Sequence, residues 1–416
     1  MSALLEQAEV KSPAAPLDLQ TLLSPVTLEE FFSRYWGKST LFLQRGDRGF
    51  YGNLLTMADI DRCLLAATAD TTSKSLQVVV PPGSERKNSE IIPAQGISKD
   101  RLYNAYLSGD TVRIIGVEKY WPPLALLVAS MGEEIAAKLG VNLFLTPARS
   151  QAFPLHFDSV DVFVLQLAGS KKWSIWEPTY ERPQLLAIAE PQQARMTEQD
   201  ESKLTLREEI VLEAGDALYM PRGFYHKAVA QDDLSLHLTI TVQPIYWLDF
   251  FRRAFELATL EDAELRDELP PQFVRDDRLR DDMARTFSRL MARFSEKASF
   301  DAAYRSLVEE QVRVRYFPAD GHFAALETLQ EIAPSTLLER RRGLVCLVET
   351  NEKTAWIRFG PNRVEGPLAV APTFEFIRDH RVFRITDLPG ILSAESMVVL
   401  VRRLIREGLL RPIGGE

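Results

Sequence analysis

Three side chains able to hold a metal ion stand at two places in the chain. His156 and Asp158 lie in Pro154-Leu-His-Phe-Asp158, and His226 follows a predicted strand and a Pro/Gly-containing turn. On a β-strand, side chains two residues apart point to the same face. Two histidines and one carboxylate form the facial set that binds Fe(II) and leaves other positions open. Spacing alone also allows buried histidines with ordinary hydrogen bonds.

A polar face runs along the strand predicted at Leu236–Val242. Alternation places His237, Thr239 and Thr241 on one side of this strand. Such a face lines a ligand-containing interior or faces solvent, and the pattern leaves both open. In the first case His237 would orient a metal ligand.

Two lysines follow the predicted turn at Gly169-Ser170. Lys171 and Lys172 lead into the strand that ends at Trp176. A lysine that points inward binds a carboxylate through a charge-assisted hydrogen bond. Two solvated turn lysines are the alternative.

The region that carries these residues reads as a series of short strands with turns between them. Gly169-Ser170 and Gly215-Asp216 supply turn residues. This pattern predicts a closed or double-sheet β architecture such as a jelly roll, with an exposed insertion at 180–206. The predicted strands are Val141–Leu145, His156–Leu167, Lys172–Trp176, Glu209–Leu212, Ala217–Met220 and Leu236–Val242.

The segment before these strands mixes helices and strands. Thr27-Leu-Glu-Glu30 is a capping box for a helix that ends at Gly37. Another helix is predicted from Pro122 to about Leu139, ending at Gly140. The other elements expected here are a helix after Thr56 and strands at Thr40–Gln44, Leu76–Val80 and Val112–Ile115.

After Pro244 the pattern becomes helical. Met283, Phe287, Leu290, Met291 and Phe294 form one apolar face. This face packs within the chain or against a second copy. Further on, a hairpin around 350–353 and an amphipathic helix at 393–407 are typical of a winged-helix module. The expected divisions are a flexible tail (1–16), an N-terminal elaboration with the strand-rich region (17–245), a helical region (246–314) and a winged helix (315–416).

Composition narrows the class of protein. The chain has 416 residues, 46% of them hydrophobic, with a net charge of −9, so a general electrostatic nucleic-acid binder is not expected. Only Cys63 and Cys346 are present, which argues against a disulfide framework. The N-terminus lacks the apolar core of a secretory signal, and no run is long enough to span a membrane. The cytoplasm is therefore the expected location.

Several stretches together resemble the JmjC-domain ribosomal oxygenases of the cupin superfamily. They are Gly140–Pro147, Pro154–Asp158, Phe163–Trp173, Glu213–His226 and Ser235–Thr239. The likeness extends to Phe31–Lys38, Leu41–Arg45, Ile385–Gly390 and Leu404–Leu410. The resemblance covers nearly the whole chain.

The resemblance implies a fold and a chemistry. The fold is α+β: a double-stranded β-helix (jelly-roll or cupin) JmjC core with an N-terminal elaboration, a helical dimerisation region and a C-terminal winged helix. The activity is that of an Fe(II)- and 2-oxoglutarate-dependent dioxygenase that hydroxylates a protein. By motif position His156, Asp158 and His226 bind the iron, while Lys171 and Asn142 bind 2-oxoglutarate.

Two residues expected near the substrate differ from those of the family's histidyl hydroxylases. Phe144 and Thr241 stand where those proteins carry tyrosine and serine. Phe144 has no hydroxyl to offer an imidazole, so an arginyl target in a large-subunit ribosomal protein is favoured over a histidyl one. A positively charged target would suit an acidic protein.

Two other functions stay open. One is a JmjC-type lysine demethylase, although no methyl-lysine cage can be placed in the sequence. The other is a binding or scaffold protein whose winged helix engages a partner while the barrel is vestigial. Nucleic acid and membrane are not expected partners, whereas a homodimer is.

Overall fold

The structure is a computed structural model that describes residues 17–69, 75–86, 99–184, 201–315 and 321–413. The chain divides into two compact units, with the boundary between Pro244 and Ile245. The helices that follow this boundary and the C-terminal module belong to the same unit, so the division at 314/315 stays a prediction. The expected tail at 1–16 lies outside the described residues. No helix among the described residues is long and apolar enough to cross a membrane.

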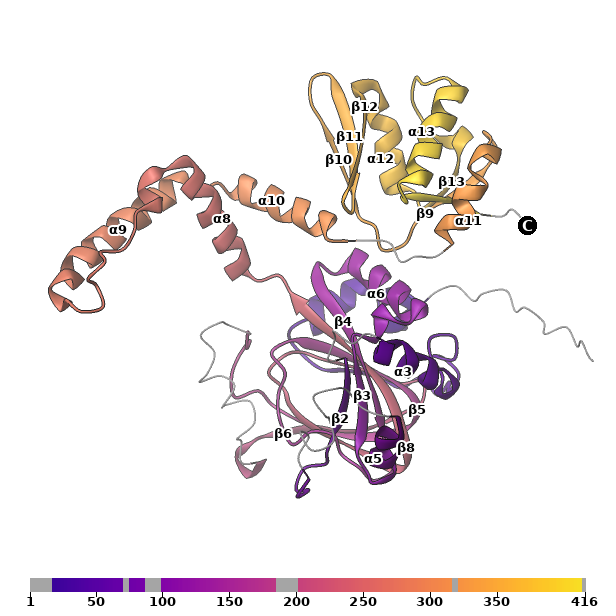
Figure 1. Cartoon of the computed structure of the whole chain (residues 1–416), viewed down its shortest axis with the longest axis vertical. Helices are drawn as coiled ribbons and strands as arrows, with labels where there is room; N and C mark the ends of the chain where they lie inside the picture. The colour runs from indigo at the N-terminus through magenta and orange to yellow at the C-terminus, as the bar shows by residue number, and fades with distance from the viewer. Residues whose placement is uncertain (1–16, 70–74, 87–98, 185–200, 316–320, 414–416) are drawn as a thin grey trace, which may run out of the picture. The chain divides into compact units, whose positions relative to one another are not determined.

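The first unit is built on an eight-stranded antiparallel sheet that curves into a barrel-like shape (Figure 1). Its strand order is β1-β7-β5-β8-β4-β3-β2, and β6 pairs with β5. The strands are β1 (Leu41–Leu43), β2 (Leu76–Val79), β3 (Thr111–Ile115), β4 (Ala137–Thr146), β5 (Asp161–Trp176), β6 (Leu206–Glu213), β7 (Ala217–Met220) and β8 (Tyr225–Pro244).

Strands β5 and β8 pair along almost their whole length, from Asp161 opposite Val242 to Trp176 opposite Tyr225. The turn predicted at Gly169-Ser170 is therefore wrong, because these residues bend one continuous strand. Gly169 has φ +62°, and a Cβ there would lie 1.6 Å from the Leu234 carbonyl oxygen. Only glycine fits this bend, which resembles a turn signal in the sequence.

Helices precede and flank this sheet. They are α1 (Leu19–Leu23), α2 (Leu28–Glu30), the π-helical turn η1 (Phe31–Tyr35), α3 (Ile60–Ala69), α5 (Lys99–Leu107) and α6 (Pro122–Glu134). Short 3-10 turns are η2 (Met57–Asp59), η3 (Val117–Lys119) and η4 (Glu201–Lys203). The helix predicted to continue to Leu139 ends at Glu134 instead, because Ala137–Leu139 pair with the end of β8. Gly140 thus lies within β4 and caps no helix.

The second unit begins with helices α8 (Trp247–Glu261), α9 (Arg280–Lys297) and α10 (Phe300–Arg313) and the turns η5 (Ala263–Arg266) and η6 (Asp277–Leu279). Phe255 of α8 stacks on Phe294 of α9, with ring centroids 3.7 Å apart. Arg293 of α9 forms an ion pair of 2.7 Å with Asp262. Apart from these contacts α9 is poorly covered, and no residue of it is buried.

The C-terminal part of this unit contains two three-stranded sheets around one apolar core. The predicted hairpin is confirmed, since β10 and β11 pair across a tight turn. The predicted amphipathic helix is confirmed as α13, with Ser393 as its N-cap. The elements are α11 (His322–Glu327), η7 (Leu329–Glu331), β9 (Leu337–Arg340), β10 (Cys346–Thr350), β11 (Thr354–Phe359), β12 (Asn362–Pro367), η8 (Leu368–Val370), α12 (Ala371–Asp379), β13 (Val382–Arg384), η9 (Ile385–Asp387), α13 (Ala394–Arg406) and β14 (Leu410–Pro412).

Candidate metal centre

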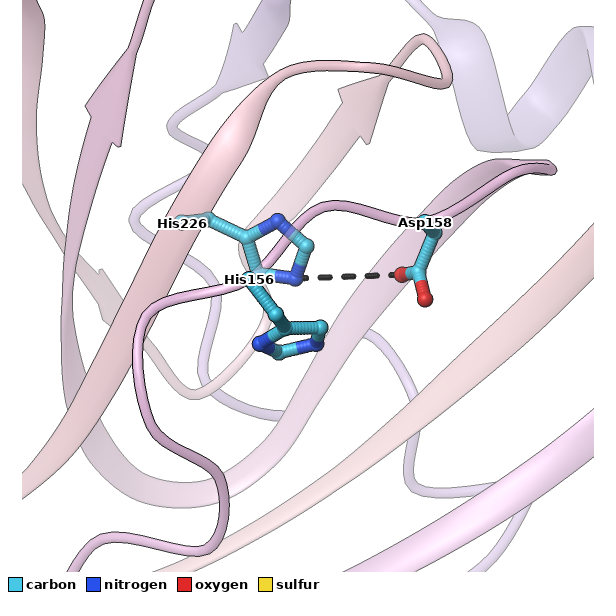
Figure 2. Close-up of side chains that lie close together, drawn as sticks. All are labelled: His156, Asp158 and His226. Carbon is cyan, nitrogen blue, oxygen red and sulfur yellow. Dashed lines mark ion pairs between the residues drawn. The ribbon is translucent and has the colours of Figure 1, made fainter. Parts of the chain in front are cut away.

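His156, Asp158 and His226 come together in the first unit, with one ligand atom from each within 4.8 Å of the others. His226 Nε2 lies 3.8 Å from Asp158 Oδ2, and Figure 2 shows the three side chains turned toward one another. His156 and Asp158 precede β5 instead of lying in a strand, which corrects the expected start of that strand. His156 still pairs with His226 through an isolated bridge, and this bridge brings the first ligand segment to the second.

The two imidazoles are held in one orientation by the backbone. Nδ1 of His156 is 2.8 Å from the Pro154 carbonyl oxygen, and Nδ1 of His226 is 3.1 Å from that of Phe224. A carbonyl only accepts, so both Nδ1 atoms must carry the proton and donate it. Each Nε2 then keeps a free lone pair, which is the tautomer that a metal-binding histidine needs.

His226 is buried and uncharged at neutral pH. Burial and, to a smaller extent, the neighbouring His156 together lower the pKa of His226 to about 4, against the opposite effect of Asp158. Neutral imidazole is the form that binds a metal ion. The donor set of two nitrogens and one carboxylate oxygen therefore fits a divalent transition metal.

The three residues open into a cavity enclosed by the sheet. Its walls contain every residue that the sequence predicted for the pocket: Asn142, Phe144, Lys171, His237, Thr239 and Thr241. His237 is buried, and its ring stacks on that of Phe144 with centroids 4.9 Å apart. The solvent-facing alternative for the His237 side of β8 is therefore wrong.

Lys171 lies at the inner end of this cavity and is only 2% exposed. Its Nζ donates to Thr146 Oγ1 at 3.2 Å, and no carboxylate among the described residues pairs with it. Burial lowers the pKa of Lys171 to about 7. The next residue, Lys172, faces outward and forms an ion pair of 3.0 Å with Glu209. Of the two lysines, only Lys172 is therefore the solvent-exposed residue that the alternative interpretation expected.

Other cavity residues carry buried nitrogen atoms with no hydrogen-bond partner in the described part of the chain. They include Nε1 of Trp173, Nδ1 of His237 and Nε of Arg113. A buried donor without an acceptor costs about 1–3 kcal/mol. Together with the Lys171 ammonium, these groups fit a small ligand that is rich in acceptor oxygens, such as a dicarboxylate.

Arg113 and Trp173 are cavity residues that the sequence did not reveal. Arg113, on β3, places its guanidinium 5.3 Å from the centroid of Phe144 and 5.6 Å from that of Phe153. The signal available was one charged residue inside the apolar strand predicted at Val112–Ile115. Trp173 could not be predicted as a cavity residue, because a tryptophan in a buried strand is typical of the hydrophobic core.

The sheet and the cavity define a JmjC protein with a cupin-like fold, and residues 121–250 match the JmjC domain family. The chain is 31% identical over 258 residues to ribosomal oxygenase 1 of Gallus gallus, a match covering 60% of this chain and 41% of that relative. It is 30% identical over 250 residues to the bifunctional lysine-specific demethylase and histidyl-hydroxylase NO66 of Aedes aegypti, covering 60% and 38% of the two chains. The chain is thus similar to JmjC ribosomal oxygenases, and the match spans less than half the length of these relatives.

Solved structures extend the likeness in fold beyond the JmjC domain. Escherichia coli ycfD matches with a TM-score of 0.52 at 13% identity, covering 93% of this chain and 98% of that one. A structure of the same ribosomal oxygenase in complex with cobalt and 2-oxoglutarate matches with a TM-score of 0.50 at 13% identity, covering 94% and 99%. At this identity the likeness concerns the fold.

Proposed function

We propose that the chain is an Fe(II)- and 2-oxoglutarate-dependent oxygenase that hydroxylates a residue of a ribosomal protein. The observation that carries this proposal is that His156, Asp158 and His226 come together in the wall of a cavity that the buried Lys171 also lines. The names of the relatives support a ribosomal protein as the substrate. The E. coli structure that holds cobalt and 2-oxoglutarate supports the metal and the cosubstrate.

Each group of the cavity has a role in this proposal. His156, Asp158 and His226 would hold the metal, and Lys171 would bind the distal carboxylate of 2-oxoglutarate. Asn142 lies on the same wall and would contribute a further polar contact. When bound, Fe(II) and 2-oxoglutarate supply the activation of dioxygen, so that one oxygen atom enters a C–H bond of the substrate while 2-oxoglutarate becomes succinate and carbon dioxide.

The chain's own residues prepare the site for this chemistry. The Pro154 and Phe224 carbonyls orient the imidazoles, and the aromatic rings of Phe144, Phe153 and Trp173 limit access of water. Lys171 compensates the negative charge of the cosubstrate at the buried end. The protein thus binds and orients the metal, the cosubstrate and the target side chain, while the metal and the cosubstrate supply the oxidising power.

Two target side chains are supported by different observations. The ring of Phe144 offers no hydroxyl to an imidazole, which favours an arginyl target. The Arg113 guanidinium beside Phe144 places positive charge on the same wall, which favours an uncharged target such as a histidyl residue. Arg113→Gln separates these cases, because it would improve turnover of an arginyl peptide and leave that of a histidyl peptide unchanged or lower.

Mass spectrometry of ribosomal proteins from cells with and without this protein tests the function directly. The proposal expects one ribosomal protein to gain a single oxygen atom only when the protein is present. The purified chain should release succinate from 2-oxoglutarate in the presence of Fe(II), and His156→Ala should abolish this release. Formaldehyde with loss of methyl groups would indicate a demethylase, and succinate formed without Fe(II) would exclude the proposed mechanism.

We also propose that α8 and α9 form a homodimer interface. Trp247 and Phe287 are 69% and 66% exposed, and α9 buries none of its residues within its own unit. Exposed apolar helix faces of this kind mark association surfaces. Light scattering should give twice the chain mass for the wild type and the single-chain mass for Phe287→Glu. A monomeric wild type at micromolar concentration would contradict this assignment.

A further inference from the structure

The two segments that carry the proposed metal ligands, residues 154–161 and 219–226, are joined by more than the ligands. His226 N donates to the His156 carbonyl at 2.7 Å, and His156 N donates back at 3.2 Å. Gly223 N donates to the Asp158 carbonyl at 3.0 Å. These backbone bonds connect the segments at and beside the ligands.

A buried carboxylate makes a third connection, three residues beyond Asp158. Asp161 begins β5 and is fully buried. Its Oδ2 accepts from the Tyr219 hydroxyl at 3.1 Å, and its Oδ1 accepts from the Arg222 amide at 2.9 Å. The Arg222 guanidinium lies 3.4 Å from the same Oδ1. One side chain thus adds two contacts between the start of β5 and the 219–226 segment, beside the strand pairing of Val162 with Met220 and of Phe163 with Tyr219. The Arg222 contact lies beyond the end of this pairing.

The same network reaches the N-terminal part of the unit. The Tyr219 hydroxyl donates to Asp161 and accepts from the Gly37 amide at 2.8 Å. The Tyr219 ring stacks on Trp36, with centroids 6.1 Å apart, and meets the edge of Phe31 at 4.9 Å. The segment after η1 is therefore linked to the Asp161 carboxylate through the Tyr219 hydroxyl.

We propose that Asp161 is a positioning residue for the metal site: by joining Tyr219 and Arg222 it fixes the separation of the Asp158 and His226 segments. The proposal rests on the metal site of the proposed function. Asp158 stands on a stretch outside any strand, so its place depends on the bonds on either side of it. Groups that hydrogen-bond directly to metal ligands contribute about 10–100-fold to metal affinity. Asp161 acts on the ligands through the backbone beside them, so this range is the upper limit for its loss.

A purely structural role for Asp161 makes a different prediction, and the chain offers a matched control. Asp110 is also fully buried at the start of a strand, and Arg86 donates to its two oxygens at 2.9 and 2.6 Å. Asp110 does not contact either ligand segment through these bonds. Asp110→Asn removes the same kind of buried carboxylate from the same unit and leaves the bonds between 154–161 and 219–226 in place.

The experiment is a Co(II) titration of the full chain, followed by the visible absorption of the bound ion. Wild type, Asp161→Asn, Tyr219→Phe and Asp110→Asn are compared, with His156→Ala as the reference for a lost ligand and thermal unfolding of each metal-free chain alongside. We expect Asp161→Asn to weaken Co(II) binding, by at most about 10–100-fold, and to shift the absorption band. Tyr219→Phe should do so less, and Asp110→Asn should keep wild-type affinity and spectrum although it unfolds earlier.

Two results overturn the proposal and are distinguishable. If Asp161→Asn and Tyr219→Phe bind Co(II) like the wild type while unfolding earlier, Asp161 acts on stability alone and the metal site stands. The same holds if Asp110→Asn loses affinity in step with its stability. If the wild type shows no Co(II) binding that His156→Ala removes, the metal site itself is wrong, and the positioning role falls with it.

Discussion

At the more exposed end of the cavity, its mouth, two of the three proposed metal ligands, His156 and Asp158, stand on backbone that precedes β5, and the third, His226, lies near the start of β8. At the inner end Lys171 stands within the paired part of β5. His156 and Asp158 lie before β5, and a few hydrogen bonds hold them to the His226 segment. Lys171 is paired on both sides, with Leu212 of β6 and Ala230 of β8. The positions of His156 and Asp158 are thus set by local contacts, and those of His226 and Lys171 by strand pairing.

The two ends of the cavity also differ in the free-energy cost of desolvating their polar groups. Asp158 presents its carboxylate to a ligand at little desolvation cost, because it is partly open to solvent, and the buried His226 avoids the cost of a buried charge by staying neutral. The inner end keeps an ammonium in an environment that disfavours its charge, which destabilises the ligand-free chain. The cosubstrate would relieve this cost on binding, so stability and affinity are expected to oppose each other at Lys171 and not at the metal ligands.

The largest effect is expected at the mouth. His226→Ala removes a ligand outright and should weaken Co(II) binding by more than about 100-fold, since groups that only orient ligands contribute about 10–100-fold. Isothermal titration measures the change, with His380→Ala in the second unit as a control that keeps wild-type affinity. Equal Co(II) affinity for His226→Ala and wild type would remove His226 from the metal site.

At the inner end Lys171→Met should act in two directions. Affinity for 2-oxoglutarate should fall by about 10–100-fold, because a hydrogen bond to a charged group contributes about 1.5–3 kcal/mol. The ligand-free variant should unfold at a higher temperature, because it no longer buries an ammonium. Lys172→Met alters an outward lysine and should change the affinity little. If Lys171→Met were less stable than the wild type and bound 2-oxoglutarate with unchanged affinity, the buried ammonium would not be the destabilising group proposed here.

The pH dependence of the inner end follows from the pKa of Lys171, which burial lowers from 10.5 to about 7. Between these values the unfolded chain keeps the proton that the folded, ligand-free chain has lost, so stability rises with pH in this window. Affinity for 2-oxoglutarate should fall over the same window, by up to about tenfold per pH unit above 7, because the ammonium is the binding form. Titrations at pH 7 and 8 measure this trend, and Lys171→Met should show neither slope.

The smallest effect concerns the hydroxyls behind Lys171. Thr111 Oγ1 lies 3.2 Å from Thr146 Oγ1, which accepts from Lys171. Thr111→Val removes one neutral hydrogen bond and should weaken 2-oxoglutarate binding by about 2–5-fold, for a contribution of about 0.5–1 kcal/mol. Thr373→Val, a buried threonine of the second unit, should leave the affinity unchanged. A larger loss than that of Lys171→Met would reverse the expected order of the two residues.

The sequence predicted the residues of the candidate site better than it predicted the secondary structure around them. His156, Asp158, His226 and Lys171 were singled out by their positions in the motifs of a known family, because their spacing alone also allowed ordinary buried histidines and solvated lysines. The strand expected to begin at His156 begins at Asp161, because local hydrogen bonds replace strand pairing there. The alternation of apolar and polar residues does not show where strand pairing gives way to local hydrogen bonds.

Two further misses have physical causes. Gly169 resembles a turn residue in sequence, and only the pairing of β5 with β8 reveals a bend within one strand. The apolar run from Pro122 through Leu139 reads as one helix, because nothing local marks the point where pairing with β8 takes over. Arg113 reaches the cavity from β3, and the pairing of β3 with β4 that places it there is a long-range contact.

The bond between Gly37 and Tyr219 spans 182 positions of the chain, and it bears on the order in which the protein is made. β1 is complete early in translation, yet its partner β7 does not exist until the intervening residues have been added. At about 5–20 residues per second this interval lasts roughly 10–40 s. Throughout this interval β1 lacks the strand with which it pairs, so its backbone donors and acceptors and the aromatic residues beside it stay open to solvent or to other chains.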